Sequence, residues 1–183
     1  MRSDGGLILF VTQESGQDAF GSLGIYYSVS DNGREWSEYS PLASERNLTG
    51  NFLPSHTSYR GRDYVAFQAF SPGTTSTFQL YLKYSDDGGV SWSEPVYLSG
   101  FEDANDYFEG DPQVFDNQRP YILGTPEGLR LVWERGYSGG NPQIYYAELD
   151  YSGEISGQPE QVSRGAAECR NPEIVYYRGE EYI

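Results

Sequence analysis

The sequence has little cysteine and little histidine, and each scarcity excludes a class of site. Among its 183 residues there is one cysteine, Cys169, so no disulfide can form within the chain. The one histidine, His56, leaves a cysteine nucleophile short of a base and a zinc ion short of ligands. We therefore predict no metal ion and no other cofactor.

Long apolar runs and positive charge are also scarce. No run of apolar residues reaches the length needed to cross a bilayer, and the first residues, MRSDGG, do not form a signal peptide. The chain has 12 basic residues against 27 acidic ones, for a net charge of −15. A strongly negative protein repels nucleic-acid backbones and anionic lipid surfaces, so we predict neither nucleic-acid binding nor membrane insertion.

Aromatic residues and glycine are abundant instead. Aromatics make up 16% of the chain, 17 residues are tyrosine and 22 are glycine, while no stretch shows the periodicity of an amphipathic helix. Aromatic runs separated by turn residues are typical of short strands. The sequence therefore predicts an all-β protein.

A turn motif recurs between strand-like runs. VSDNGREWSE at 29–38 aligns with SDDGGVSWSE at 85–94, and both follow aromatic runs. A third, less complete copy follows the run at 144–149 and keeps Asp150. The residues that match at an offset of 56 are Asp31 with Asp87, Gly33 with Gly89 and Trp36 with Trp92.

The runs around each turn motif define a unit of four strands. Units that repeat after 56 residues, each with four short antiparallel strands, are typical of β-propeller blades. A β-sandwich is the alternative all-β fold, but it would not repeat its turn motif at the same hairpin. We predict one partial propeller domain over 1–183, with about three blades of a six- or seven-bladed ring. The approximate units are 1–43, 51–98 and 111–163, followed by the start of a further blade at 171–183.

The turn motif itself has a folding role at each position. An acid accepts hydrogen bonds from nearby backbone N–H groups, glycine adopts a positive φ, and tryptophan buries a large surface. The stretch resembles the Asp-box, or BNR repeat, of the sialidase superfamily. The match is complete at Ser85, Asp87, Gly89 and Trp92. It is good at Asp31, Gly33 and Trp36, where Val29 replaces the serine, and partial at Asp150. In that family the box lies on the face away from the catalytic site, which implies that these residues are structural.

The sialidase resemblance implies where catalytic residues belong. The family places an arginine in an Arg-Ile-Pro motif that this chain lacks, and Ser15 stands where a strand-end arginine is expected. Asp18 falls near the position of the family's acid/base aspartate and is a candidate for that role. The family's remaining catalytic groups belong to later blades, beyond Ile183.

A second resemblance involves prolines at strand openings. GDPQVF and RNPEIVYY look like the Asp-Pro openings of five-bladed furanosidase and arabinosidase propellers. In that family an aspartate before the proline stabilises the transition state. Asp111 holds that place here, so it is a second catalytic candidate, while Leu53 and Asn171 hold it in the other units.

The longer connections are predicted to gather on the face opposite the turn motifs, where they suit a binding site. Aromatic and acidic side chains in these connections suit a sugar, although an ordinary solvated set of loops would have the same composition. A carbohydrate or another small molecule is the predicted ligand. The candidate binding residues are Phe52, His56, Tyr107, Glu109, Tyr137 and Arg170.

Two functional hypotheses follow. The first is a sialidase-like Asp-box module that binds a glycan or another ligand without turnover. The second is part of a glycoside hydrolase of the exo-sialidase or the furanosidase type. An arc of about three blades has open sheet edges, so it is expected either to be a piece of a longer protein or to self-associate. The family resemblance favours an extracellular, periplasmic or cell-surface location.

Overall fold

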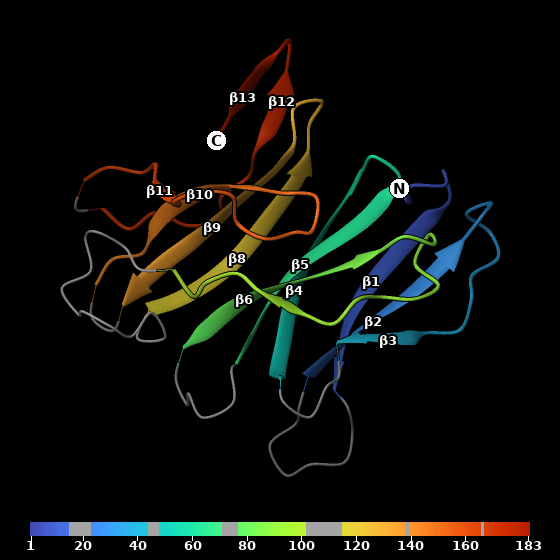
Figure 1. Ribbon diagram of the computed structural model, residues 1–183. Coiled ribbons are helices and arrows are strands. Elements are labelled where there is room, and N and C mark those ends of the chain that lie inside the picture. The colour runs from blue at the N-terminus through green and yellow to red at the C-terminus, as the bar shows by residue number, and fades with distance from the viewer. Residues whose placement is uncertain (15–22, 44–47, 71–76, 102–114, 138–139, 166) are drawn as a thin grey trace.

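The computed structural model confirms an all-β protein built from antiparallel sheets that follow one another like propeller blades (Figure 1). It describes residues 1–14, 23–43, 48–70, 77–101, 115–137, 140–165 and 167–183. Within these ranges no helix is present, and hence none that could cross a membrane.

Each sheet is a meander of strands that are consecutive in the chain. The first has the order β1-β2-β3, the second β4-β5-β6-β7, the third β8-β9-β10-β11, and a hairpin β12-β13 follows. The bounds are β1 Leu7–Glu14, β2 Leu23–Ser30, β3 Ser40–Ala43, β4 Thr49–Tyr59, β5 Arg62–Phe70, β6 Phe78–Ser85 and β7 Val96–Tyr97, then β8 Phe115–Gly124, β9 Leu129–Tyr137, β10 Gln143–Leu149, β11 Glu160–Gln161, β12 Val175–Tyr177 and β13 Glu180–Tyr182.

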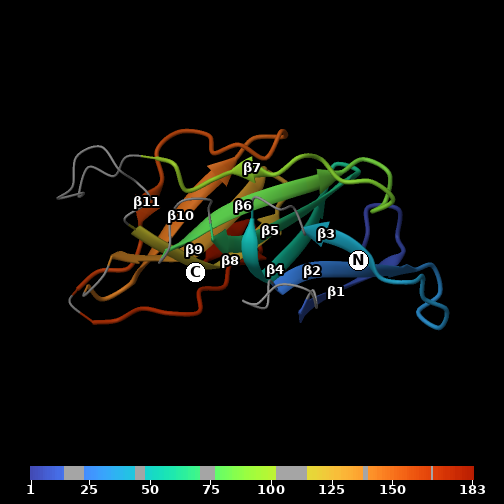
Figure 2. The same cartoon turned by 90° about the horizontal axis from the view of Figure 1, so that it is seen from below.

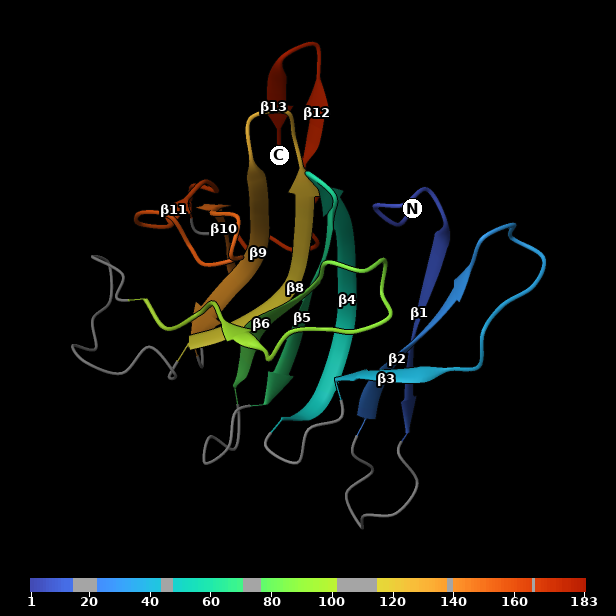
Figure 3. The same cartoon turned by 45° about the vertical axis from the view of Figure 1, so that its right-hand side comes forward.

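Two hydrophobic cores join neighbouring sheets. Strand β5, in the second sheet, is almost entirely buried. Its side chains alternate between a face packed on the first sheet and a face packed on the third sheet. Val65 and Phe67 pack with Ile25 of the first sheet, whereas Tyr64 and Ala66 pack with the third sheet. Burial on both faces explains why the sequence of β5 reads as a nearly continuous apolar run. Figure 3 shows the resulting fan of sheets.

The short turns lie on one face of the molecule, called here the turn face, and the opposite side is the loop face. The turns between β4 and β5, β8 and β9, and β12 and β13 are all at the upper end in Figure 1. The β4–β5 connection has positive φ at both central residues, Arg60 and Gly61, and Arg178-Gly179 repeats this in β12–β13. This backbone twist suits two-residue hairpins. Figure 2 views the molecule from below, toward the loop face.

Candidate functional site

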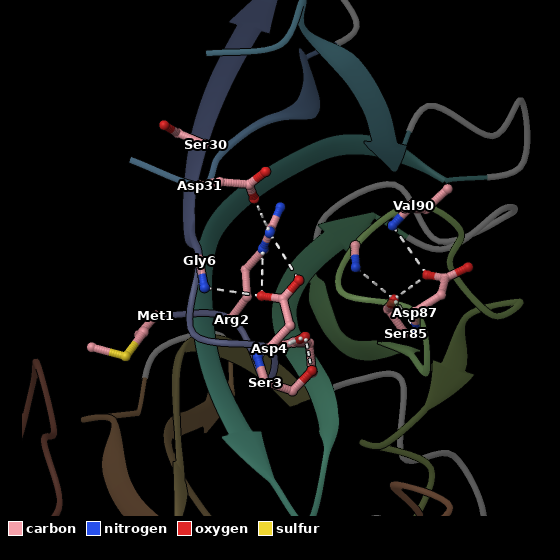
Figure 4. Close-up of polar contacts among 12 residues, drawn as sticks. Met1, Arg2, Ser3, Asp4, Gly6, Ser30, Asp31, Ser85, Asp87 and Val90 are labelled. Atoms are coloured by element: carbon pink, nitrogen blue, oxygen red, sulfur yellow. Dashed lines mark hydrogen bonds and ion pairs between the residues drawn. The ribbon is translucent and has the colours of Figure 1, made fainter. Parts of the chain in front are cut away.

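The turn after β6 is held together by the side chains that the sequence motif singled out. Ser85 Oγ donates to Asp87 Oδ1 at 2.8 Å and accepts from Gly89 N at 2.8 Å (Figure 4). Asp87 Oδ1 accepts from the backbone N–H groups of Val90 at 3.0 Å and Ser91 at 2.9 Å. Hydrogen bonds from the Ser91 hydroxyl and amide lower the pKa of Asp87 to about 2. The carboxylate is therefore fully engaged as an acceptor within its own turn.

The turn after β2 uses different residues from those that the sequence alignment matched. Asn32 Oδ1, rather than the Asp31 carboxylate, accepts from the turn amide of Glu35 at 2.9 Å. Ser30 is the serine of this turn, since its Oγ accepts from Gly33 N at 2.9 Å, so Val29 does not replace it. The alignment was displaced by one residue because this turn is one residue shorter than the turn after β6. Asp31 instead points outward, with its side chain 88% exposed, and pairs with Arg2 Nη2 at 2.6 Å (Figure 4).

The turn after β10 keeps the same hydrogen-bond pattern in reduced form. Asp150 Oδ1 accepts from Glu154 N at 3.0 Å and from Ser152 Oγ at 2.6 Å. Gly153 has a φ of +85°, and a Cβ there would lie 2.5 Å from Leu82 Cδ2 of the second sheet. This turn thus packs closely against the preceding sheet.

The two tryptophans of the turns have different surroundings. The Trp92 ring packs on the first sheet, with centroids 5.8 Å from Tyr27 and 6.2 Å from Phe10. Trp36, in contrast, is 42% exposed. It lines a groove of about 330 Å³ together with Arg2, Val29, Ser30, Asp31, Asn32, Glu35 and Ser37. The contrast arises because the first sheet has a neighbour on one side only among the described residues.

A buried carboxylate, Asp63, organises the turn-face end of β4 and β5. It accepts hydrogen bonds from Ser3 N at 2.9 Å, Ser3 Oγ at 2.7 Å, Ser58 Oγ at 2.6 Å and His56 Nε2 at 3.0 Å. Burial alone raises the pKa of Asp63, but the hydrogen bonds from His56, Ser58 and Ser3 outweigh it and lower the pKa to about 2. The cluster therefore ties the N-terminal segment to the second sheet. His56, a predicted binding residue, is engaged here and packs its ring 5.6 Å from Phe10.

A left-handed residue before a proline recurs at or before the first strand of each later sheet. Leu53, Arg119 and Asn171 all have a positive φ, between 50° and 55°, and each precedes a proline. In β4 and β8 this residue lies within a shift of strand register. The structural counterpart of Leu53-Pro54 in the third sheet is therefore Arg119-Pro120, and Asp111-Pro112 lies outside the described residues.

Each of the later pre-proline residues is anchored by the sheet before it. Gln68 Oε1 in β5 accepts from Arg119 N at 2.8 Å, and Glu134 Oε1 in β9 accepts from Asn171 N at 2.6 Å. Gln68 lies opposite Phe52 and Glu134 lies opposite Gln118, so the two acceptors hold equivalent places. This hydrogen bond, called here the inter-sheet latch, is a repeated element of the fold.

Glu134 does more than close a latch. Its side chain is only 2% exposed, and Oε2 accepts from Arg119 Nη1 at 2.9 Å and Arg170 Nη1 at 3.3 Å. Arg170 also pairs with Glu168 through Nη2. We call Arg119, Glu134, Arg170 and Glu168 the arginine–glutamate cluster. A buried carboxylate with two charged partners is well compensated, and it fixes the position of both guanidinium groups.

The arginines of this cluster retain donors for a ligand. Their side chains are 35% exposed at Arg119 and 44% exposed at Arg170. Arg119 uses Nη1 toward Glu134 and Gln118, and no described residue accepts from its Nε or Nη2. A planar guanidinium that is held on one edge and open on another suits a carboxylate or a sugar hydroxyl.

The structure brings together only part of the predicted site. Arg170 belongs to the arginine–glutamate cluster. Phe52 lies opposite Gln68, whose side chain accepts from Arg119 N. Tyr137 ends β9, opposite Phe115. Four further candidates lie outside the described residues: Asp18, Tyr107, Glu109 and Asp111. Within the described ranges, no three His, Cys, Asp or Glu side chains gather as metal ligands would.

Sequence reasoning missed Arg119, Glu134 and Gln68. The Arg119-Pro120 dipeptide was the available signal, because a residue before proline near the start of an innermost strand also occurs at Leu53 and Asn171. Glu134 was hidden inside a run that reads as a buried strand, where a carboxylate has no periodic signature.

Comparison with known proteins extends the structural argument. No protein-family model matches the sequence, and no curated protein matches it significantly. Solved structures do match. A Hadza microbial sialidase has a TM-score of 0.62 with 18% identity, covering 87% of this chain and 36% of the sialidase. An α-L-arabinanase from Penicillium chrysogenum has a TM-score of 0.62 with 17% identity, covering 92% of this chain and 49% of the arabinanase.

A third neighbour is a family-32 β-fructofuranosidase from Bombyx mori, with a TM-score of 0.57 and 17% identity, covering 96% of this chain and 39% of that enzyme. The chain thus spans between about a third and a half of the length of these neighbours. At such identities the likeness concerns the fold. The chain is a partial β-propeller of four-stranded antiparallel blades, and its fold is that of propeller glycoside hydrolases.

Proposed function

We propose that this chain is part of a sialidase-like Asp-box propeller that binds a glycan on its loop face. The observation that carries the proposal is the arginine–glutamate cluster. Glu134 is buried and holds Arg119 and Arg170 side by side, while Arg119 keeps donors available among the described residues. A ligand bearing a carboxylate supplies the acceptors that these donors need.

The charge of the protein favours a site-specific interaction with such a ligand. The chain carries a net charge of −15, so an anionic glycan is repelled by most of its surface. Two arginines at one place are therefore the feature that selects an acidic sugar. Bidentate guanidinium–carboxylate pairs add geometric specificity to the attraction.

The turns support the Asp-box part of the proposal. Asp87 accepts two backbone N–H groups within its turn, and Asn32 and Asp150 accept from the corresponding amides. These side chains are all on the turn face, away from the arginine–glutamate cluster. We assign them a structural role and leave ligand binding to the loop face.

Hydrolysis is the second candidate function, favoured by the fold shared with a sialidase and an arabinanase. Asp18 remains the candidate acid/base, and Asp111 is a second candidate. A carboxylic acid in that role needs a raised pKa to donate a proton near neutral pH. Release of sugar from aryl sialosides and aryl arabinofuranosides measures the activity directly. Full turnover in Asp18→Asn would remove Asp18 from the mechanism.

The binding proposal is tested with a sugar that cannot be cleaved. We expect the methyl 2-thio-α-glycoside of N-acetylneuraminic acid to bind in isothermal titration calorimetry, and methyl β-galactoside to bind more weakly. Arg119→Ala should weaken binding of the acidic sugar about tenfold or more, since it removes a charge-assisted contact. Arg34→Ala removes an exposed arginine on the turn face and is the matched control. Equal loss in both variants, or no binding by the unmodified chain, contradicts the proposal.

A further inference from the structure

Three phenylalanines gather at the loop-face end of the second sheet. The Phe70 and Phe78 rings are stacked with centroids 4.1 Å apart, and the Phe52 ring meets Phe78 edge-on at 5.6 Å. Gly50 lies beneath them with a φ of +60°, and a Cβ there would be 2.8 Å from Phe70 Cδ2. We call Phe52, Phe70 and Phe78 the phenylalanine cluster.

The phenylalanine cluster belongs to neither hydrophobic core. All three rings are half-buried, and none of them is part of the two core clusters that join the sheets. Large apolar side chains outside a core are informative when they are contiguous, because contiguous apolar surface marks binding sites.

The fold does not require these rings. The inter-sheet latch shows which residues of the second and third sheets correspond, because Gln68 and Glu134 each accept from the N–H of a residue before proline. In the third sheet Gln118 therefore holds the position of Phe52, and Gly136 holds the position of Phe70. A Cβ added at Gly136 would lie 3.2 Å from Pro142 Cα. A packing requirement of the repeat would recur in the third sheet, and this cluster does not.

Several contacts place the phenylalanine cluster beside the arginine–glutamate cluster. Phe52 lies opposite Gln68, which holds Arg119 N at 2.8 Å. Phe78 N donates to Asp116 Oδ1 at 2.7 Å, and Asp116 also accepts from Gln118, the residue before Arg119. A short chain of hydrogen bonds thus joins the backbone of Phe78, through Asp116 and Gln118, to the Arg119 guanidinium.

We propose that the phenylalanine cluster is an apolar subsite that takes the ring attached to the acidic sugar bound at Arg119. This inference rests on the proposed function and names a further part of the ligand. The faces of aryl groups and the C–H faces of pyranoses both bury apolar area against aromatic side chains. The subsite therefore selects glycosides whose aglycone is a ring over those with a small alkyl aglycone.

The test compares two non-cleavable probes, the methyl and the phenyl 2-thio-α-glycosides of N-acetylneuraminic acid. By calorimetry on the 183-residue chain, the phenyl probe should bind about tenfold more tightly than the methyl probe, given the apolar area of one ring. Phe52→Leu and Phe78→Leu should each reduce this ratio to about 3 or less. Tyr39→Leu, which removes an aromatic residue that is 53% exposed elsewhere, is the control and should keep the ratio.

The outcomes separate the two proposals. If neither probe binds, the proposed function fails and the subsite with it. If both probes bind the unmodified chain equally, acidic-sugar binding stands and the subsite is overturned. A tenfold ratio that persists in both phenylalanine variants also overturns the subsite, because the ring is then bound elsewhere.

Discussion

Substitutions of Glu134 can separate its two roles, which are to accept the latch hydrogen bond and to bind two arginines. Its Oε1 closes the latch to Asn171 N at 2.6 Å, and its Oε2 holds Arg119 and Arg170. Gln68 closes the equivalent latch to Arg119 N at 2.8 Å with an amide oxygen. Glu134→Gln therefore keeps a proven latch acceptor but removes the charge and replaces the oxygen that accepts from the two arginines with an amide NH2 group, whereas Glu134→Leu removes every acceptor.

The expected losses of stability follow from the contacts. A hydrogen bond to a charged acceptor is worth about 1 kcal/mol more than one to a neutral acceptor, so Glu134→Gln should lower the free energy of unfolding by about 1 kcal/mol. Glu134→Leu leaves the Asn171 amide without an acceptor, so it should cost about 3 kcal/mol. The arginines are more than a third exposed and can regain water, which keeps the loss below that of a fully buried pair.

Equilibrium unfolding in urea, followed by tryptophan fluorescence, measures these differences. Gln68→Leu is the matched control for a latch without charge, and about 2 kcal/mol is expected for it. The reasoning is refuted if Glu134→Gln is as destabilising as Glu134→Leu, because the latch would then depend on charge. It is equally refuted if Glu134→Leu costs less than about 1 kcal/mol, because the latch would then contribute nothing.

Three further predictions concern stability and association. The pKa of Asp63 is depressed from 3.8 to about 2 in the folded protein, so its contribution is complete above about pH 4 and is lost as pH falls toward 2. Asp63 should therefore contribute a drop of about 2 kcal/mol in the free energy of unfolding over that window, and in denaturant titrations of Asp63→Asn the drop should be smaller by that amount, while the part due to other carboxylates such as Asp87 remains. Gly153→Ala should lower the free energy of unfolding by about 2–3 kcal/mol, because the residue has a positive φ and an added Cβ would clash with Leu82. Gly157→Ala, at a similar φ but with open space around it, should lower it by about 1 kcal/mol. Equal losses would contradict the clash. Leu9, 43% exposed on the open first sheet, should support self-association, so light scattering should give a smaller mass for Leu9→Lys; an unchanged mass would exclude this surface.

Much of the fold was determined by local sequence. The aromatic runs before the turn motifs at 29–38 and 85–94 and the run at 144–149 predicted strands that the structure confirms as β2, β6 and β10. Their apolar and aromatic content, with turn residues between them, is enough to specify strands and their order, because both are short-range properties. The glycines at 33 and 89 were also predictable, since each adopts a positive φ in its turn.

Tertiary structure decided the site. Sequence alignment paired Asp31 with Asp87, whereas Asn32 accepts the turn hydrogen bonds, because the turn after β2 is one residue shorter. It also paired proline 112 with prolines 54 and 172, whereas the register shift of β8 lies at Arg119-Pro120. Packing also sets the surroundings of His56, a candidate binding residue, whose ring contacts Asp63 near the turn face. Glu134 in β9 contacts Arg119 in the neighbouring strand β8, and it also contacts Arg170 and Asn171 in the segment that precedes β12. Such contacts depend on which sheet packs against which, and the sequence of a single strand contains no information on that choice.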